Sequence, residues 1–252
     1  MLKDFSKEKF DIIIQAGQSN SDGTGFGDVE KPYEPNEFVW YMNGDFTMSP
    51  ASERVAGNCI QSNYSLTFAQ EYMDNGILQG DRKLLVLRTS VGGTGFLDHR
   101  WGMEDDLYLR MMEMIRTALA LNPQNRLVAL LWHQGETDAL LHAGYEGHYN
   151  NLMTLLRSVR EEFQMPELPF VAGDFVQHWI GKNQEICAPV LAAIRDVCRD
   201  CGNGTFVETD GLLSNWQEYE LKGIEWLDDI HFSRESLYKL GRRYFEAFRK
   251  VR

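Results

Sequence analysis

The chain has 252 residues, of which 43% are hydrophobic and 25% are charged, and its formal net charge at pH 7 is −12. A surface this acidic repels nucleic acid and anionic membranes, which excludes both as expected partners. It also disfavours anionic substrates unless the pocket concentrates arginines, so neutral esterified substrates fit better. The length suffices for a sizeable core and no linker-like tract divides it, so we expect one domain spanning residues 1–252.

The N-terminus and the cysteines are typical of a cytoplasmic protein. Five of the first nine residues are charged, and this stretch leads directly into an apolar run, without the apolar core of a signal peptide. Cys198 and Cys201 form a single Cys-x-x-Cys pair without a second pair to complete a zinc site. We therefore expect reduced thiols and no metal or other cofactor, while a homo-oligomer stays open.

Apolar runs of strand length alternate with helical patterns along the chain. The predicted strands are residues 11–15, 83–88, 127–132, 169–174 and 205–208, and the predicted helices are residues 65–75, 104–121, 145–163, 183–201 and 233–251. This alternation predicts an α/β fold, a three-layer α/β/α sandwich around a five-stranded parallel sheet. Residues 23–63 carry turn residues and aromatics but little periodicity. We interpret this segment as an excursion from the regular alternation of strands and helices that lies beside the functional site.

Polar side chains follow the ends of these strands. Ser19 follows the first strand, Gln134 follows the third, and Asp228 and His231 precede the last helix. The carboxyl ends of parallel strands meet at one edge of the sheet, where α/β proteins place reactive groups. A serine nucleophile needs a base and an orienting carboxylate, and Asp-x-x-His supplies both on one loop. Asp229 remains an alternative carboxylate.

Four segments together resemble the SGNH hydrolase superfamily. Within it they are most similar to the carbohydrate esterase family six and sialate O-acetylesterase-like group, which includes acetylxylan esterase relatives. Their order and spacing cover nearly the whole chain. The segments are Gly17-Gln18-Ser19-Asn20-x-x-Gly23, Gly92-Gly93-Thr94, Trp132-His133-Gln134-Gly135-Glu136-x-Asp138 and Asp228-x-x-His231.

The resemblance implies a flavodoxin-like order of strands and helices and a serine esterase that removes O-acetyl groups from a carbohydrate without a metal. Ser19 would attack the acetyl carbonyl and form an acetyl-Ser19 intermediate. His231 would carry the proton, and Asp228 would orient His231. The expected substrate is an acetylated xylo-oligosaccharide or a sugar of the sialic acid type. Two alternatives stay open, namely an esterase for a non-carbohydrate short-chain ester and a non-catalytic carbohydrate-binding descendant.

The same resemblance implies an oxyanion hole, a set of donors fixed before the reaction begins. Its members would be the backbone N–H of Ser19, that of Gly92 or Gly93, and the side-chain amide of Gln134. The supporting residues of these segments are Gln18, Asn20 and Glu136. Glu136 is expected to accept backbone N–H groups that hold the first and third segments together, rather than to act as an acid or base.

The sequence points to substrate-binding residues less specifically than to catalytic residues. Trp101 is a candidate platform for an acyl group or a sugar, in competition with Trp179 and Trp216, and core packing is an equal alternative. His133 either faces the site or packs beneath it. Arg54 in the 23–63 segment, or Arg88 at the end of the second predicted strand, could bind the carboxylate of a sialic acid. His142 and His148 are expected to be solvated.

Overall fold

The computed structural model describes residues 4–57, 59–223 and 227–252 of the chain. In that part, a seven-stranded sheet forms the centre of the molecule, with the strand order β3-β2-β6-β1-β7-β8-β9. Six strands run parallel to their neighbours, whereas β3 pairs antiparallel with β2. The strands are β1 (Lys9–Gly17), β2 (Val39–Met42), β3 (Met48–Pro50), β6 (Arg82–Arg88), β7 (Arg126–His133), β8 (Phe170–Gly173) and β9 (Gly204–Val207), with β4 (Arg54–Ala56) and β5 (Cys59–Gln61) as a separate hairpin.

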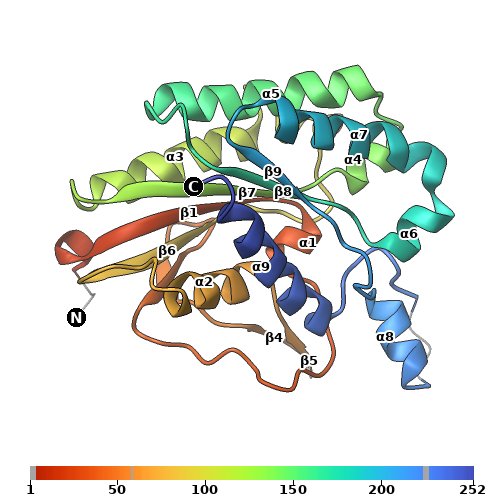
Figure 1. Cartoon of the computed structure of the whole chain (residues 1–252), viewed down its shortest axis with the longest axis horizontal. Helices are drawn as coiled ribbons and strands as arrows, with labels where there is room; N and C mark the ends of the chain where they lie inside the picture. The colour runs from red at the N-terminus through yellow and green to blue at the C-terminus, as the bar shows by residue number, and fades with distance from the viewer. Residues whose placement is uncertain (1–3, 58, 224–226) are drawn as a thin grey trace.

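Helices cover both faces of the sheet (Figure 1). Helices α2 and α9 pack together on one face, and α3, α5 and α7 cover the other. This confirms the expected three-layer α/β/α arrangement. The helices are α1 (Ser19–Asp22), α2 (Tyr64–Asp74), α3 (Asp106–Ala120), α4 (Glu136–Leu140), α5 (Tyr145–Glu162), α6 (Gln177–Lys182), α7 (Gln184–Asp200), α8 (Asn215–Leu221) and α9 (Arg234–Phe248), with a 3-10 turn at Phe5–Lys7. Over the described ranges, none of them is long and apolar enough to span a membrane.

The sheet is larger than the five strands predicted from the sequence. Strands β2 and β3 both lie in the 23–63 segment that we interpreted as an excursion. With only four residues, β2 is too short to show a periodicity of its own. Its register against β6, from Val39 beside Leu84 to Met42 beside Leu87, gives it a place in the core. The sheet therefore has a sixth parallel strand, and β3 closes that edge.

The centre of the sheet explains why the apolar runs are continuous rather than alternating. Strand β1 lies between β6 and β7, and its residues Ile12, Ile13 and Ile14 are all fully buried. A central parallel strand is covered by helices on both faces, so side chains that point either way meet apolar neighbours. The five predicted strands overlap β1, β6, β7, β8 and β9 in the structure.

Gly17 determines how closely β1 and β7 approach at the carboxyl edge of the sheet. It pairs with His133 in register and has a φ of +133°, in the region that favours glycine. A Cβ atom at this position would lie 2.1 Å from the carbonyl oxygen of His133. Only glycine therefore allows the two strands to stay paired up to the point where α1 begins.

Candidate active site

Ser19, His231 and Asp228 form a continuous chain of hydrogen bonds at the carboxyl edge of the sheet. The Ser19 Oγ lies 2.8 Å from Nε2 of His231, and Nδ1 of the same ring lies 2.8 Å from Oδ1 of Asp228. Ser19 is 7% exposed and the His231 side chain is 24% exposed. The structure thus brings together three side chains that the sequence separates by up to 212 positions, in the geometry that a serine nucleophile requires.

Asp228 is fixed by a residue that the sequence did not single out. The side-chain amide of Asn215, at the start of α8, donates to Oδ2 of Asp228 over 2.8 Å, and its backbone N–H donates to the carbonyl of His231. Burial alone would raise the pKa of Asp228, but the hydrogen bonds from His231 and Asn215 outweigh it and lower that pKa. Asp228 is therefore ionised at neutral pH and can hold the His231 ring.

The residue before the serine fastens the start of α1 to the third segment. The backbone N–H of Gln18 donates to the carbonyl of His133 over 3.0 Å. Its side-chain oxygen accepts from the backbone N–H of Thr137 over 3.1 Å. Gln18 is thus anchored to the third segment through both its backbone and its side chain, and Ser19 begins α1 directly after it. This fits the supporting role expected for Gln18.

Asn20 links three segments of the site through its buried side chain. Its amide donates to Oε1 of Glu136 over 2.7 Å and to the carbonyl of Ile230 over 3.0 Å. Its oxygen accepts from the backbone N–H of Phe232 over 3.0 Å. Glu136 does connect the first and third segments as expected, but the partner that reaches it is the Asn20 side chain rather than a backbone N–H. The same amide fixes the residues on either side of His231.

Gly92 and Gly93 differ in how they face the serine. A Cβ atom on Gly92 would lie 3.5 Å from Cβ of Ser19, whereas one on Gly93 would meet nothing within 4 Å. Gly93 also has a φ of +67°, so it shapes the turn after β6. Of the two alternatives that the sequence left open, Gly92 is therefore the one that borders Ser19.

Gln134 does not occupy the place expected of an oxyanion donor. Its side chain is fully buried, and its amide nitrogen donates to the Thr94 carbonyl over 3.2 Å and to Asp138 over 2.9 Å. Both amide hydrogens are thus directed to protein acceptors. Asp138 also accepts from the backbone N–H groups of Phe96 and Leu97. In this geometry Gln134 and Asp138 brace the loop that carries Gly92.

Two candidate substrate contacts lie in the core, which is the alternative that the sequence left open for both side chains. His133 is fully buried, with Nδ1 2.8 Å from the Tyr244 hydroxyl, and burial lowers its pKa to about 3. It therefore packs beneath the site as a neutral ring. Trp101 is also fully buried, donates from its indole nitrogen to Thr94 and packs edge-on against Trp132. Neither ring can form a platform for a sugar.

The structure also defines the environments of Trp179, Trp216 and His148. Trp179 is buried. Trp216 is partly exposed, and its backbone N–H donates to the carbonyl of Asp228. It stays a candidate for substrate contact. His148 is 2% exposed and has Nδ1 3.3 Å from an oxygen of Asp138, so the expectation that it is solvated was wrong.

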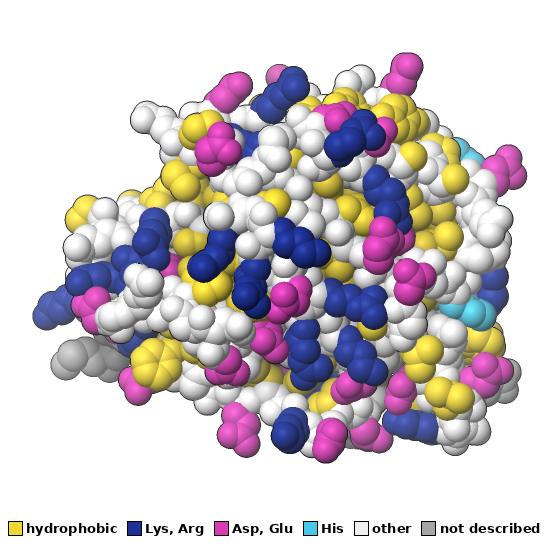
Figure 2. All heavy atoms as spheres, in the orientation of Figure 1, with side chains coloured by type: hydrophobic (Ala, Val, Ile, Leu, Met, Phe, Trp, Pro, Cys, Tyr) yellow, Lys and Arg dark blue, Asp and Glu magenta, His cyan; other side chains and the backbone are white. Residues whose placement is uncertain are grey.

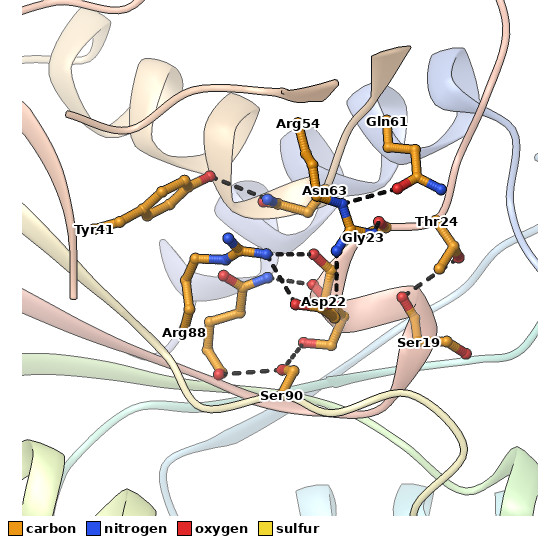
Figure 3. A network of polar contacts seen from close by, with 12 residues as sticks. Ser19, Asp22, Gly23, Thr24, Tyr41, Arg54, Gln61, Asn63, Arg88 and Ser90 are labelled. Carbon is orange, nitrogen blue, oxygen red and sulfur yellow. Dashed lines mark hydrogen bonds and ion pairs between the residues drawn. The ribbon is translucent and has the colours of Figure 1, made fainter. Parts of the chain in front are cut away.

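Both candidate arginines converge on the end of α1 (Figure 3). Arg54 donates to the Gln61 side chain and to the Gly23 carbonyl, and its guanidinium lies 3.6 Å from an oxygen of Asp22. Arg88 donates to both the carbonyl and the carboxylate of Asp22. Since Ser19 and Asp22 are the first and last residues of α1, this cluster lies one short helix away from the serine.

In the described part of the chain, no group of three or more His, Cys, Asp or Glu side chains could hold a metal ion. The four cysteines are free thiols, and Cys187 and Cys198 are buried.

Residues 9–250 match the family model of carbohydrate esterases described as sialic acid-specific acetylesterases. A probable 9-O-acetyl-N-acetylneuraminic acid deacetylase of Escherichia coli (strain K12) is 30% identical over 87 residues, 32% of this chain and 27% of that protein. A probable carbohydrate esterase of Arabidopsis thaliana is 26% identical over 181 residues, 64% of this chain and 66% of that protein. The matches thus span less than two thirds of either relative.

Solved structures give the same fold over almost the whole chain. The crystal structure of NanS superposes with a TM-score of 0.81 at 17% identity and covers 96% of this chain and 97% of that one. A carbohydrate acetylesterase from Xanthomonas citri superposes with a TM-score of 0.63 at 15% identity, over 96% of this chain and 56% of that one. Because the family model extends over nearly all of its residues, the chain belongs to the carbohydrate esterase, sialic acid-specific acetylesterase family.

Proposed function

We propose that this protein is a serine esterase that removes O-acetyl groups from an acetylated carbohydrate. The observation that carries the proposal is the hydrogen-bonded chain from Ser19 through His231 to Asp228, in a member of a carbohydrate esterase family. A non-catalytic descendant would have no need to keep a nucleophile, a base and an orienting carboxylate in this order. The family favours a sugar ester over a non-carbohydrate ester.

The proposed reaction is a double displacement. Ser19 Oγ attacks the acetyl carbonyl while Nε2 of His231 takes its proton, and the resulting imidazolium is stabilised by Asp228. The tetrahedral intermediate collapses as His231 returns the proton to the sugar oxygen, which leaves acetyl-Ser19. A water molecule, activated by the same ring, then attacks the acetyl group and releases acetate.

The developing oxyanion is stabilised by backbone donors in this proposal. The N–H of Ser19 at the start of α1 and the N–H of Gly92 in the neighbouring loop are the two groups that we assign. Asp138 and Gln134 fix that loop from behind through hydrogen bonds to residues 94, 96 and 97. Donors held in place before the reaction are worth about 10²- to 10³-fold each in turnover.

The test is hydrolysis of p-nitrophenyl acetate and p-nitrophenyl butyrate, together with acetate release from acetylated xylo-oligosaccharides and O-acetylated sialic acid. The wild type should turn over acetate in preference to butyrate, and Ser19→Ala should lose turnover of every ester. Ser21→Ala is the matched control, because Ser21 lies in the same helix but its buried hydroxyl is hydrogen-bonded to Ala16, Tyr64 and Ser90. Equal rates in the wild type and Ser19→Ala would refute the proposal.

A further inference from the structure

His148 is a buried histidine that the proposed reaction does not use. It lies in the first turn of α5 and is 2% exposed, whereas Figure 2 shows histidine side chains that reach the surface at the right of the molecule. Its Nδ1 lies 3.3 Å from Oδ2 of Asp138, and neither side chain is exposed to solvent. A carboxylate only accepts hydrogen bonds, so the ring carries a proton on Nδ1, toward Asp138. The two residues thus form a buried His–Asp pair, separate from the pair that serves Ser19.

The Asp138 carboxylate is packed directly against the backbone of the loop after β6. Its Oδ1 accepts from the backbone N–H groups of Phe96 and Leu97 over 3.0 and 2.8 Å, and its Oδ2 accepts from the Gln134 amide over 2.9 Å. Together with Nδ1 of His148, four N–H groups face the carboxylate, which is about as many as its two oxygens can accept. Burial alone would raise the pKa of Asp138, and contact with His148 is the strongest of the effects that lower it instead.

The same loop carries Gly92, and hydrogen bonds to its neighbours hold Gly92 in place. The backbone N–H of Val91 donates to the carbonyl of Gly17 over 3.1 Å, and the carbonyl of Val91 accepts from the Thr94 hydroxyl over 2.7 Å. The carbonyl of Thr94 in turn accepts from the Gln134 amide over 3.2 Å. The two-glycine turn that borders the serine is therefore held at both of its ends.

We propose that His148 is a positioning residue for the oxyanion hole, which acts through Asp138 to hold the N–H of Gly92 where the oxyanion develops. Gln134 connects the two ends of this path, because its amide nitrogen donates both to Asp138 and to the carbonyl of Thr94. Without the N–H of His148, the buried carboxylate would keep three donors, and its hold on the loop would loosen because an incompletely paired buried charge is costly. Oxyanion donors act in the transition state, so the chemical step slows while substrate binding does not change. This inference rests on the proposed function and adds a residue that does not touch the reacting atoms.

The experiment measures kcat and KM for p-nitrophenyl acetate in variants of His148. His148→Phe keeps a ring but removes the donor, and it should lower kcat about 10- to 100-fold, the effect of a displaced oxyanion donor, with KM within about twofold of the wild type. His148→Asn keeps a side-chain N–H at the position of Nδ1 and should recover most of the lost kcat. Val159→Ala is the control, because Val159 is buried in the same helix, about 16 Å along its axis from His148. It should lose stability but keep the kcat of the wild type.

Inhibition by 1,1,1-trifluoroacetone, a ketone to which an activated serine adds to give an oxyanion, is the second measurement. Its inhibition constant should rise in His148→Phe by about the factor by which kcat falls, and return toward the wild-type value in His148→Asn. Should His148→Phe fail to fold, His148→Gln takes its place, because its longer side chain puts the amide near the position of Nε2 rather than Nδ1. An unchanged kcat, a rise in KM alone, or an inhibition constant that does not follow kcat would overturn the role of His148 while the esterase proposal stands. A wild type that does not hydrolyse acetyl esters would instead refute the proposed function.

Discussion

Asn20 and Glu136 lie 116 positions apart in the chain and are joined by a buried hydrogen bond of 2.7 Å between the Asn20 amide and Oε1 of Glu136. The residue next to Ser19 is thereby tied to the segment that follows β7. The same amide donates to the carbonyl of Ile230, one position before His231. This fully buried side chain therefore fixes both the proposed nucleophile and the proposed base.

Asn20→Ala is expected to reduce both stability and turnover. It leaves the Glu136 carboxylate and the N–H of Phe232 without their partner, and each buried group left unpaired costs about 1–3 kcal/mol. The free energy of unfolding in urea and kcat for p-nitrophenyl acetate are the measurements. Asn75→Ala is the control, because Asn75 is an exposed cap of α2. A variant as stable and as active as that control would contradict the bridging role.

Glu136→Gln should become more stable relative to the wild type as the pH rises. Burial raises the pKa of Glu136 above its usual value of 4.5, although the Asn20 bond opposes this. Between its unfolded and folded pKa values, Glu136 keeps a proton in the folded state that the unfolded chain has released. Wild-type stability therefore falls from about pH 4.5 until the pH passes the folded pKa, by up to about 1.4 kcal/mol per pH unit. A glutamine cannot titrate, yet its oxygen still accepts from Asn20, so turnover should persist.

The pKa of Asp138, in the same helix as Glu136, is shifted in the opposite direction. Burial would raise its pKa, but hydrogen bonds from His148 and from the backbone of Leu97 and Phe96 outweigh burial and lower it. Its contribution to stability is present above its unfolded pKa of 3.8 and is lost as the pH falls through the folded value. Asp138→Asn should therefore lose stability relative to the wild type at neutral pH. The measurement for Glu136→Gln and Asp138→Asn is the free energy of unfolding in urea at several pH values. A difference from the wild type that stays the same at every pH would disprove the assigned direction of the pKa shift.

Asn215→Ala is expected to weaken the hold of Asp228 on His231. Removing the 2.8 Å bond to Oδ2 leaves burial less opposed, so the pKa of Asp228 should rise and kcat should fall about tenfold, equivalent to about 1.4 kcal/mol. The carboxyl titration of Asp228, followed by NMR, together with kcat, measures this effect. An Asp228 titration that matches the wild type would show that Asn215 does not tune the carboxylate.

Gly92→Ala and Gly93→Ala should have distinct effects on acyl selectivity. A methyl group on Gly92 would lie 3.5 Å from Cβ of Ser19, so turnover of p-nitrophenyl butyrate should fall more than that of acetate. On Gly93 the methyl group faces open space but the φ of +67° is unfavourable for alanine, which costs about 1–2 kcal/mol of stability without changing selectivity. Selectivity altered by Gly93→Ala but not by Gly92→Ala would reverse our assignment of the residue that borders the serine.

The sequence predicted the centre of this fold better than its edge. Long apolar runs such as β1 mark buried parallel strands because helices cover both faces. Strand β2 has four residues, and only its pairing with β6 and β3 reveals its place in the sheet. A strand this short, next to the edge strand β3, has no local pattern to reveal it. The expected count of five strands was therefore too low.

The residues of the candidate site likewise include some that the sequence could predict and some that it could not. Ser19, His231 and Asp228 could be predicted because their residue types and spacing are specific to one chemistry. The burial of His133 and Trp101 could not be predicted, since a motif does not tell which side chains point into the core. Asn215 carried no signal either, because it belongs to no motif and acts only through its distance to Asp228.

The central claim is that Ser19 is the nucleophile, and labelling with a fluorophosphonate tests it most directly. Such a probe phosphonylates an activated serine irrespective of how fast an acetyl intermediate breaks down. After digestion, mass spectrometry should find the added group on the peptide that contains Ser19, in proportion to the loss of esterase activity, and His231→Ala should label far more slowly. Loss of activity with the group on any other residue, or full activity in a protein labelled at Ser19, would contradict the account.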